Sequence, residues 1–285
     1  MPANGIELAY ETFGDPEAPP IVLVMGLGTQ MIAWPDELCE LLAVGGRYVV
    51  RYDNRDVGHS THLTDVRAPD VKDVLLRRKR PPYTVDDMAD DLVALLDALG
   101  FGQVHVVGAS MGGFIVQSAA LRFPERFASL TLIMTSTGSR LVGQAKPHLM
   151  ARLLRRRSAV DRDAAVELAV ETFGVIGSRG KLFEADHVRD LAGRSYDRSH
   201  DPAGYLRQLA AVVAQRDRTK ELTTLAVPTL VMHGLHDPLV AASGGLALAR
   251  RIRGARFVGY SGMGHDLPRT LWPEFAREIL QHSDR

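Results

Sequence analysis

The pentapeptide Gly108-Ala109-Ser110-Met111-Gly112 constrains the fold of this chain more than any other segment. It directly follows the apolar run 104–107, and the residues after it, 113–120, have the small and apolar character of a buried helix. A Gly-x-Ser-x-Gly sequence between a strand and a helix is the pattern of a nucleophile elbow, a strained turn that exposes a serine hydroxyl. Bulky neighbours would clash at such a turn, which explains the two glycines. We therefore predict that Ser110 is a nucleophile, and the alternative is a serine in an ordinary strand-to-helix turn.

A serine nucleophile needs a base that takes its proton and a carboxylate that orients the base. Asp237 follows the predicted strand 227–232, and His265 follows the predicted strand 257–260 in a loop that also contains Gly262 and Gly264. Loops that follow parallel strands gather at one edge of a sheet, where sites form. Ser110, Asp237 and His265 are therefore the predicted catalytic residues, in the chain order Ser, Asp, His that is expected for α/β-hydrolases.

Other ionisable residues near these positions are weaker candidates. Asp266 is adjacent to His265 in the sequence and is badly placed to reach its ring. We expect His233 and His236 to shape the loop of the predicted acid. His59 and His105 lack a comparable partner context, although His59 is expected to come near the site.

Attack on a carbonyl also requires donors for the oxyanion that forms. The backbone N–H of Met111, at the start of the helix after Ser110, is one predicted donor. The second is expected from the loop after the strand that ends near residue 25, where Gly26 and Gly28 permit unusual dihedral angles. We predict the N–H of Leu27 as this donor, and the alternative is a plain glycine turn.

Apart from one long interval, predicted strands alternate with predicted helices, which indicates an α/β fold with a mainly parallel sheet and helices on both faces. The predicted strands are 6–13, 21–25, 47–52, 104–107, 130–134, 229–232 and 256–260, and the predicted helices include 35–44, 84–99 and 272–282. From about 141 to 222 the sequence shows several helices and no strand. A structureless loop of that length would be unusual, so a helical cap is predicted over 139–222, inserted in a core of 1–138 and 223–285. Residues 60–82 are expected to be irregular.

Composition excludes several classes of partner. Lys plus Arg and Asp plus Glu number 34 each, which argues against nucleic acid or an anionic membrane as a partner. The basic runs 77–80 and 155–157 are expected to be solvated surface, and arginines in 152–157 are a weaker candidate for attracting an anionic substrate. The single cysteine, Cys39, cannot form an intramolecular disulfide. Neither a signal peptide nor a membrane-spanning apolar run is visible, so a cytoplasmic protein is expected.

Metal and nucleotide motifs are also missing from the sequence. It has no His-x-x-x-His pair on a predicted helix and no phosphate loop ending in Lys-Ser or Lys-Thr. Gly26-Leu27-Gly28 lacks the third glycine and the acidic residue of a dinucleotide fingerprint. The predicted chemistry therefore uses no cofactor and no metal.

Four segments carry a resemblance to a known family: 25–28, Ile32-Ala33-Trp34-Pro35, 51–60 and 262–265. With the elbow, they make the chain resemble the α/β-hydrolase superfamily over nearly its whole length and, within it, the aclacinomycin methylesterase group. The resemblance implies hydrolysis of a carboxylic ester through an acyl-serine intermediate, without a cofactor. Many relatives carry His-Gly where this chain has Met25-Gly26, a change that need not impair a backbone oxyanion donor.

The resemblance also implies roles around the site. Segment 51–60 corresponds to a loop that braces the site through internal hydrogen bonds, with Asp53 and Arg55 as structural support. Gly26, Trp34 and Phe114 are the predicted substrate-binding residues, and an apolar small-molecule ester of medium size is the expected substrate. Trp34 is equally compatible with an ordinary core position.

Other functions remain open at the level of sequence. Relatives of this fold hydrolyse carbon–carbon bonds, or act as cofactor-free haloperoxidases and perhydrolases, with the same residues. A ligand receptor on a hydrolase scaffold, or a cyclase or decarboxylase, is a further alternative. Epoxide hydrolases and haloalkane dehalogenases are disfavoured because they need a carboxylate where this chain has Ser110. Multiple turnovers would distinguish an esterase from a receptor. The sequence does not predict an oligomeric state.

Overall fold

A seven-stranded sheet forms the centre of the computed structural model, which describes residues 1–75, 80–146, 149, 159 and 161–284. The strand order is β3-β5-β4-β6-β7-β8-β9, and only β3 runs antiparallel to its neighbour. The strands are β3 (Tyr10–Phe13), β4 (Pro20–Val24), β5 (Tyr48–Tyr52), β6 (Val104–Ala109), β7 (Phe127–Ile133), β8 (Thr229–Gly234) and β9 (Arg256–Tyr260). The two predicted basic segments, 77–80 and 152–157, lie outside the described residues apart from Arg80.

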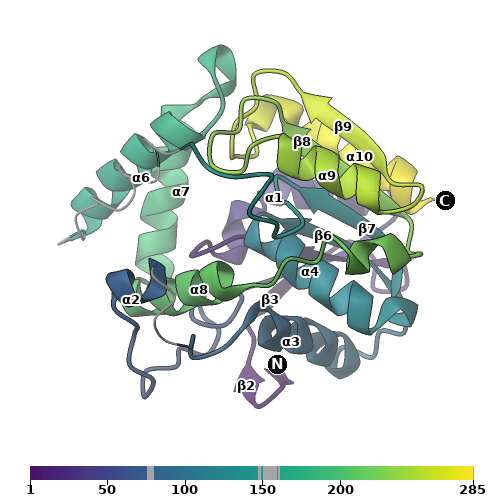
Figure 1. The fold of residues 1–285 in the computed structure, drawn as a ribbon, viewed down its shortest axis with the longest axis horizontal. Coiled ribbons are helices and arrows are strands. Elements are labelled where there is room, and N and C mark those ends of the chain that lie inside the picture. Colours follow the sequence, from purple (N-terminus) through teal and green to yellow (C-terminus); the bar gives the residue numbers. More distant parts are fainter. Residues whose placement is uncertain (76–79, 147–148, 150–158, 160, 285) are drawn as a thin grey trace.

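Alternate residues of each strand face opposite sides of the sheet, and helices cover both sides. In β4, Val22 and Val24 pack in the cluster that contains helices α3 (Val85–Ala98), α4 (Met111–Arg122) and α9 (Ser243–Arg251). Ile21 and Leu23 pack on the opposite side, with helices α1 (Asp36–Val44) and α10 (Trp272–Ser283). Figure 1 shows α3, α4 and α9 in front of the sheet in this view. The predicted α/β architecture is confirmed.

Local sequence explains where several helices begin. The Thr84 side chain accepts a hydrogen bond from the Asp87 N–H, and the Asp87 carboxylate accepts one from the Thr84 N–H, which forms a capping box at the start of α3. Pro273 lies in the first turn of α10, where its missing N–H costs no hydrogen bond. The start of α3 is thus fixed by its local sequence. Helix α3 packs beside α4, the helix that follows Ser110.

Among the described residues, three α-helices lie between β7 and β8, within the segment predicted as an insertion: α6 (Arg162–Ile176), α7 (Ala185–Arg198) and α8 (Pro202–Ala214). We call these three helices the cap. Figure 1 shows them beside the sheet rather than over its helix-covered faces. The boundaries of the insertion at residues 139 and 222 remain a prediction.

Two details of the predicted elements are wrong. The single strand expected over 6–13 is divided into β2 (Ile6–Glu7), which pairs with β1 (Pro2–Ala3), and β3, which joins the main sheet. The chain changes partners at Leu8, whose side chain is buried in the core and whose N–H donates to the Met1 carbonyl. The stretch 60–82, expected to be irregular, contains the short helix α2 (Val71–Leu75).

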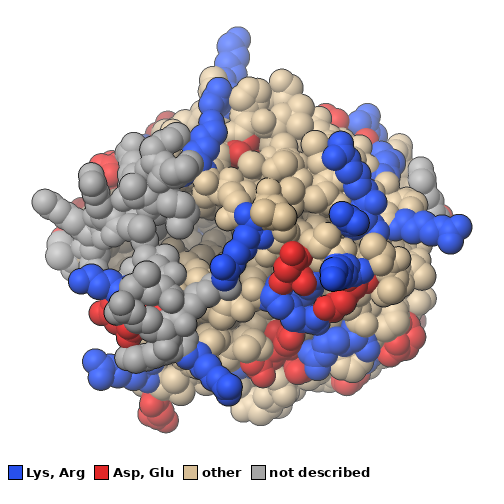
Figure 2. Space-filling view, viewed as in Figure 1, with Lys and Arg blue, Asp and Glu red and all other residues tan. Residues whose placement is uncertain are grey.

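The surface carries charges of both signs. On the face in Figure 2, Lys and Arg side chains are interspersed with Asp and Glu over the lower part of the surface. Among the described residues, none of the helices combines the length and the apolar character that a membrane span requires.

Candidate active site

Ser110 lies at the junction of β6 and α4, in a backbone conformation that serine rarely adopts. Its φ is +54° and its ψ is −115°. A non-glycine residue with such angles is strained and persists only where its surroundings hold it. The Ser110 N–H donates to the Ile133 carbonyl at 2.9 Å, and the Thr135 hydroxyl donates to the Ser110 carbonyl at 2.9 Å. Strand β7 and the residues after it therefore hold the elbow.

The glycines around Ser110 allow the elbow to pack against its neighbours. A Cβ atom at position 112 would lie 2.1 Å from the carbonyl oxygen of Val24, so α4 packs directly on the end of β4. A Cβ atom at position 108 would lie 2.5 Å from the carbonyl oxygen of Gly112. Backbone atoms cannot yield as a flexible side chain can, so both positions require glycine. The pattern read from the sequence has this steric cause.

His265 and Asp237 extend a hydrogen-bonded series from Ser110. The Nε2 atom of His265 lies 3.0 Å from the Ser110 Oγ, and its Nδ1 atom lies 2.7 Å from Oδ2 of Asp237. The Asp237 side chain is fully buried, and His265 is 8% exposed. With Nδ1 protonated toward the carboxylate, Nε2 is free to accept the serine proton. The structure thus brings together the three residues predicted as catalytic.

The loop after β8 fixes the orientation of the Asp237 carboxylate. Its Oδ1 atom accepts hydrogen bonds from the N–H groups of Leu239 at 2.9 Å and Val240 at 2.8 Å, which leaves Oδ2 for His265. His233 supports the same loop, because its Nε2 atom lies 2.8 Å from the Val240 carbonyl. Burial lowers the pKa of His233, more than its contacts with Val240 and Asp237 raise it. A neutral His233 that donates to Val240 is consistent with the predicted shaping role.

The carboxylate of Asp266 points away from the series. Its Oδ1 atom accepts a hydrogen bond of 2.6 Å from the hydroxyl of Ser178, which follows helix α6. Burial raises the pKa of Asp266, although its hydrogen bonds with Ser178 lower it in part. His236 also has a local role, because its Nδ1 atom accepts the N–H of Gly262 at 3.0 Å.

The turn 26–29 lies directly against Ser110. A Cβ atom at Gly26 would lie 3.7 Å from the Ser110 Oγ, so this glycine leaves space beside the hydroxyl. The Thr29 N–H donates to the Gly26 carbonyl at 3.3 Å, and Gly28 has a φ of +64°, as the third residue of a type II turn requires.

Within the described part of the chain, no acceptor receives a backbone hydrogen bond from the N–H of Leu27 or Met111. Both groups predicted as oxyanion donors are therefore available.

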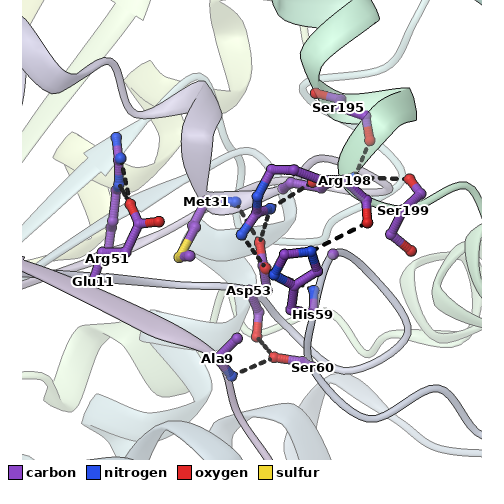
Figure 3. Close-up of polar contacts among 12 residues, drawn as sticks. Ala9, Glu11, Met31, Arg51, Asp53, His59, Ser60, Ser195, Arg198 and Ser199 are labelled. Carbon is purple, nitrogen blue, oxygen red and sulfur yellow. Dashed lines mark hydrogen bonds and ion pairs between the residues drawn. The ribbon is translucent and has the colours of Figure 1, made fainter.

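Residues after β5 form the bracing loop that the resemblance implied. The Asp53 carboxylate is fully buried and accepts hydrogen bonds from the Met31 N–H at 2.7 Å and the His59 N–H at 3.0 Å. Arg198, the last residue of α7, lies 3.1 Å from the same carboxylate (Figure 3). The Nε2 atom of His59 faces the Arg198 carbonyl at 3.2 Å, so His59 lies where the loop meets the cap. This loop joins the strand end to the cap, and the predicted support by Asp53 has a geometric basis.

Arg55 has its partner on α3. Its guanidinium contacts both carboxylate oxygens of Asp91, at 2.6 and 2.5 Å, and both side chains are buried. This two-point ion pair fixes the loop to the face of the sheet that carries α3 and α4.

The last residue of α6 and the residues that follow it make hydrogen bonds to the histidine loop, which the sequence alone did not indicate. The His265 N–H donates to the Ile176 carbonyl at 2.7 Å, and the Arg179 N–H donates to the Gly262 carbonyl at 2.9 Å. The hydroxyl of Ser178 accepts the N–H of Gly264 at 3.1 Å and donates to Asp266. These contacts join positions about 90 residues apart, which no local pattern signals.

The apolar residues predicted to bind substrate have different surroundings. Phe114 is 7% exposed and lies in the first turns of α4, close in sequence to Ser110. Trp34 has no exposed surface and packs with Leu38 and Cys39 in the cluster of α1 and α10. The core interpretation therefore describes Trp34 better than a substrate contact.

One group of side chains has the composition of a metal site. Ligand atoms of Asp56, His62 and Asp201 lie within 4.8 Å of one another. The guanidinium of Arg207 donates to both carboxylates, at 2.8 and 3.2 Å, and the Nδ1 atom of His62 lies 2.7 Å from Asp201. The carboxylate charges are thus already compensated by cationic partners, and a metal ion would have to displace Arg207. This group is an ion-pair cluster between the bracing loop and α8.

Comparison with known proteins places this geometry in context. A family model described as alpha/beta hydrolase fold matches residues 19–268. Rhodomycin D methylesterase DauP of Streptomyces sp. (strain C5) is 29% identical, over 98% of this chain and 95% of the relative. The 3-oxoadipate enol-lactonase 2 of Acinetobacter baylyi is 26% identical, over 88% and 84%. A solved thermophilic esterase from Thermogutta terrifontis is 26% identical with a TM-score of 0.71, over 98% and 95% of the two chains. The resemblance to the methylesterase group is confirmed.

Proposed function

Since the chain belongs to the alpha/beta hydrolase fold family, we propose that it is a serine hydrolase that cleaves a carboxylic ester through an acyl-serine intermediate. The observation that carries this proposal is the hydrogen-bonded series Ser110–His265–Asp237 at a strained elbow. The methylesterase and enol-lactonase relatives support the reaction class, because both names denote cleavage of a carboxylic ester.

In the acylation step, Nε2 of His265 takes the proton of Ser110 as Oγ attacks the ester carbonyl. The Asp237 carboxylate stabilises the imidazolium that forms and keeps its ring in position. The N–H groups of Leu27 and Met111 donate to the oxyanion of the tetrahedral intermediate, and losing one such donor costs roughly 3–4 kcal/mol. Collapse of the intermediate transfers the His265 proton to the departing alkoxide and leaves the acyl group on Ser110.

Deacylation repeats these steps with water as the nucleophile. His265 takes a proton from water, the resulting hydroxide attacks the acyl carbonyl, and Ser110 leaves with the proton returned by His265. The same donors stabilise the second oxyanion. The proposed cycle releases an alcohol and a carboxylic acid, and every proton it needs passes through His265.

The proposed substrate is a medium-sized, apolar ester. Leu27, which is partly exposed, and Phe114 supply apolar surface to the proposed pocket, and Gly26 leaves room for the ester carbonyl. Trp34 is left out of this pocket because it is fully buried in the core.

A chain-length series of p-nitrophenyl esters, from acetate to laurate, tests the proposal on the wild type and on Ser110→Ala. We expect multiple turnovers for the wild type and a loss of roughly a million-fold in the variant, because the three residues act as a unit. The preferred acyl length would measure the depth of the pocket. A single burst would favour a receptor, and no Ser110-dependent turnover on any ester would favour carbon–carbon or peroxide chemistry.

A further inference from the structure

One peptide group of the turn 26–29, the one between Leu27 and Gly28, makes hydrogen bonds through both its carbonyl oxygen and its N–H. The peptide between Leu27 and Gly28 has its carbonyl oxygen 3.1 Å from the Thr29 hydroxyl, which donates to it. Its N–H, that of Gly28, donates to a side chain outside the turn, the Oε1 atom of Gln208, at 2.7 Å. This N–H is therefore already used, so of the N–H groups of Leu27 and Gly28 only that of Leu27 is left to bind an oxyanion.

Gln208 comes from the cap, and both ends of its side-chain amide make hydrogen bonds. It lies in α8, it is fully buried, and its Nε2 atom donates to the Arg55 carbonyl at 2.6 Å. Both polar ends of the amide are thus satisfied by backbone groups of the core. Tyr205, one turn earlier in α8, lies against Gly28, where a Cβ atom would be only 2.4 Å from its ring.

The orientation of the central peptide decides the form of this turn. Type I and type II turns differ by a flip of the peptide between their second and third residues, and only type II needs the positive φ observed at Gly28. The bond to Gln208 stabilises the observed orientation. A flip would turn the Leu27 carbonyl and the Gly28 N–H to opposite sides of the turn and break both hydrogen bonds. Without the bond to Gln208 the turn could also shift as a whole, together with the adjoining N–H of Leu27.

We propose that Gln208 is a positioning residue, through which the cap fixes the oxyanion turn in its active conformation. This inference rests on the proposed function, because it acts through the Leu27 donor. Gln208 touches no reacting atom, so its removal should reduce the stabilisation of the transition state and leave the binding of substrate unchanged. The cap then contributes to the rate of the reaction as well as to the choice of substrate.

Gln208→Met removes both hydrogen bonds and keeps the length of the side chain. We expect kcat to fall about tenfold, less than the loss of a whole donor, with KM near the wild-type value. The second readout is the rate at which a p-nitrophenyl phosphonate labels Ser110, which needs the same oxyanion donors and no knowledge of the natural substrate. Gln208→Glu retains an acceptor for the Gly28 N–H and should recover part of the labelling rate.

Gln30→Met is the matched control. Gln30 is also buried and also joins the core to the cap, since its amide donates to the carbonyls of Ser195 and Ser199, but it makes no hydrogen bond to the turn. We expect the phosphonate to label Gln30→Met at the wild-type rate, whatever the substitution does to the free energy of unfolding. Where Gln208→Met does not fold, Gln208→Ala, which leaves space for water, replaces it with the same expectation.

The outcomes separate this inference from the proposed function. A wild-type protein that the phosphonate does not label contradicts the serine hydrolase itself. A labelled wild type with an unchanged rate in Gln208→Met or Gln208→Ala overturns the inference alone. The inference is also overturned if Gln30→Met loses as much of the labelling rate as Gln208→Met, or if Gln208→Glu is labelled no faster than Gln208→Met.

Discussion

Two carboxyl groups lie beside His265, and their hydrogen bonds assign them different roles. Asp237 contacts the imidazole and Asp266 contacts the hydroxyl of Ser178. Asp237→Asn would present an amide where the Nδ1–H needs an acceptor and would favour the wrong tautomer. We expect kcat to fall roughly ten-thousand-fold, with the fold intact. Steady-state kinetics on the best p-nitrophenyl ester measures the effect.

Asp266→Asn is the control for this prediction. Its amide oxygen can still accept the Ser178 hydroxyl, so we expect a loss of less than about tenfold. A mild effect of Asp237→Asn together with a severe effect of Asp266→Asn would show that the acid has been assigned to the wrong residue.

Residues whose roles follow from neighbouring sequence were predictable, and residues whose roles depend on distant contacts were not. Ser110 stands between two glycines after an apolar run, and that local pattern determines its backbone. Gln208 and Ser178 carry no such signal, because their partners are backbone groups far away in the chain. Trp34 had two interpretations because burial depends on which helices cover it, and this is a tertiary property.

At the scale of secondary-structure elements, the contact between β4 and α4 positions the elbow against the turn 26–29. Gly112→Ala would place a methyl group 2.1 Å from the Val24 carbonyl and push the helix from the strand. We expect a loss of about 1–3 kcal/mol in the free energy of unfolding, the usual cost of overpacking. Urea denaturation followed by circular dichroism measures it.

Gly102→Ala serves as the comparison, because a Cβ atom there would meet nothing within 4 Å. We expect this variant to retain wild-type stability. Equal stabilities for the two variants would contradict the steric explanation of the elbow glycines.

Element types were predicted better than element continuity. The buried strands that form the parallel part of the sheet are runs of apolar residues, and such runs are visible without knowledge of their neighbours. The break at Leu8 was not visible, because it arises where the chain changes from one sheet to another. The helical character of the cap was predicted, but its contacts with the two loops at the site were not.

At the scale of the whole molecule, buried charges join the core to the cap. Asp53 pairs with Arg198 and Asp56 pairs with Arg207, and His62 lies beside Asp201 at the same junction. Partial burial lowers the pKa of His62, but its hydrogen bonds to the Gly58 carbonyl and to Asp201 outweigh this and raise it above the usual value. The protonated form of His62 is therefore stabilised by folding.

This shift predicts a pH dependence of stability. Because the pKa of His62 is raised in the folded state, its contribution is complete below the ordinary histidine pKa of about 6.5 and is lost as the pH rises through the raised value. We expect the thermal unfolding midpoint to fall over this range, and to fall less in His62→Gln. Scanning calorimetry at closely spaced pH values measures how steeply the unfolding midpoint falls with pH in the wild type and in His62→Gln. Equal slopes would exclude His62 as the source of the pH dependence.

The acyl-serine intermediate is the central element of the proposed function, and it can be observed directly. Wild-type protein mixed with p-nitrophenyl acetate and quenched in acid within the first turnover would be examined by intact-mass and peptide mass spectrometry. We predict a mass increase of one acetyl group, located on the peptide that contains Ser110 and missing from Ser110→Ala. Turnover without an adduct on this peptide, or an adduct on another residue that tracks the rate, would contradict the proposal.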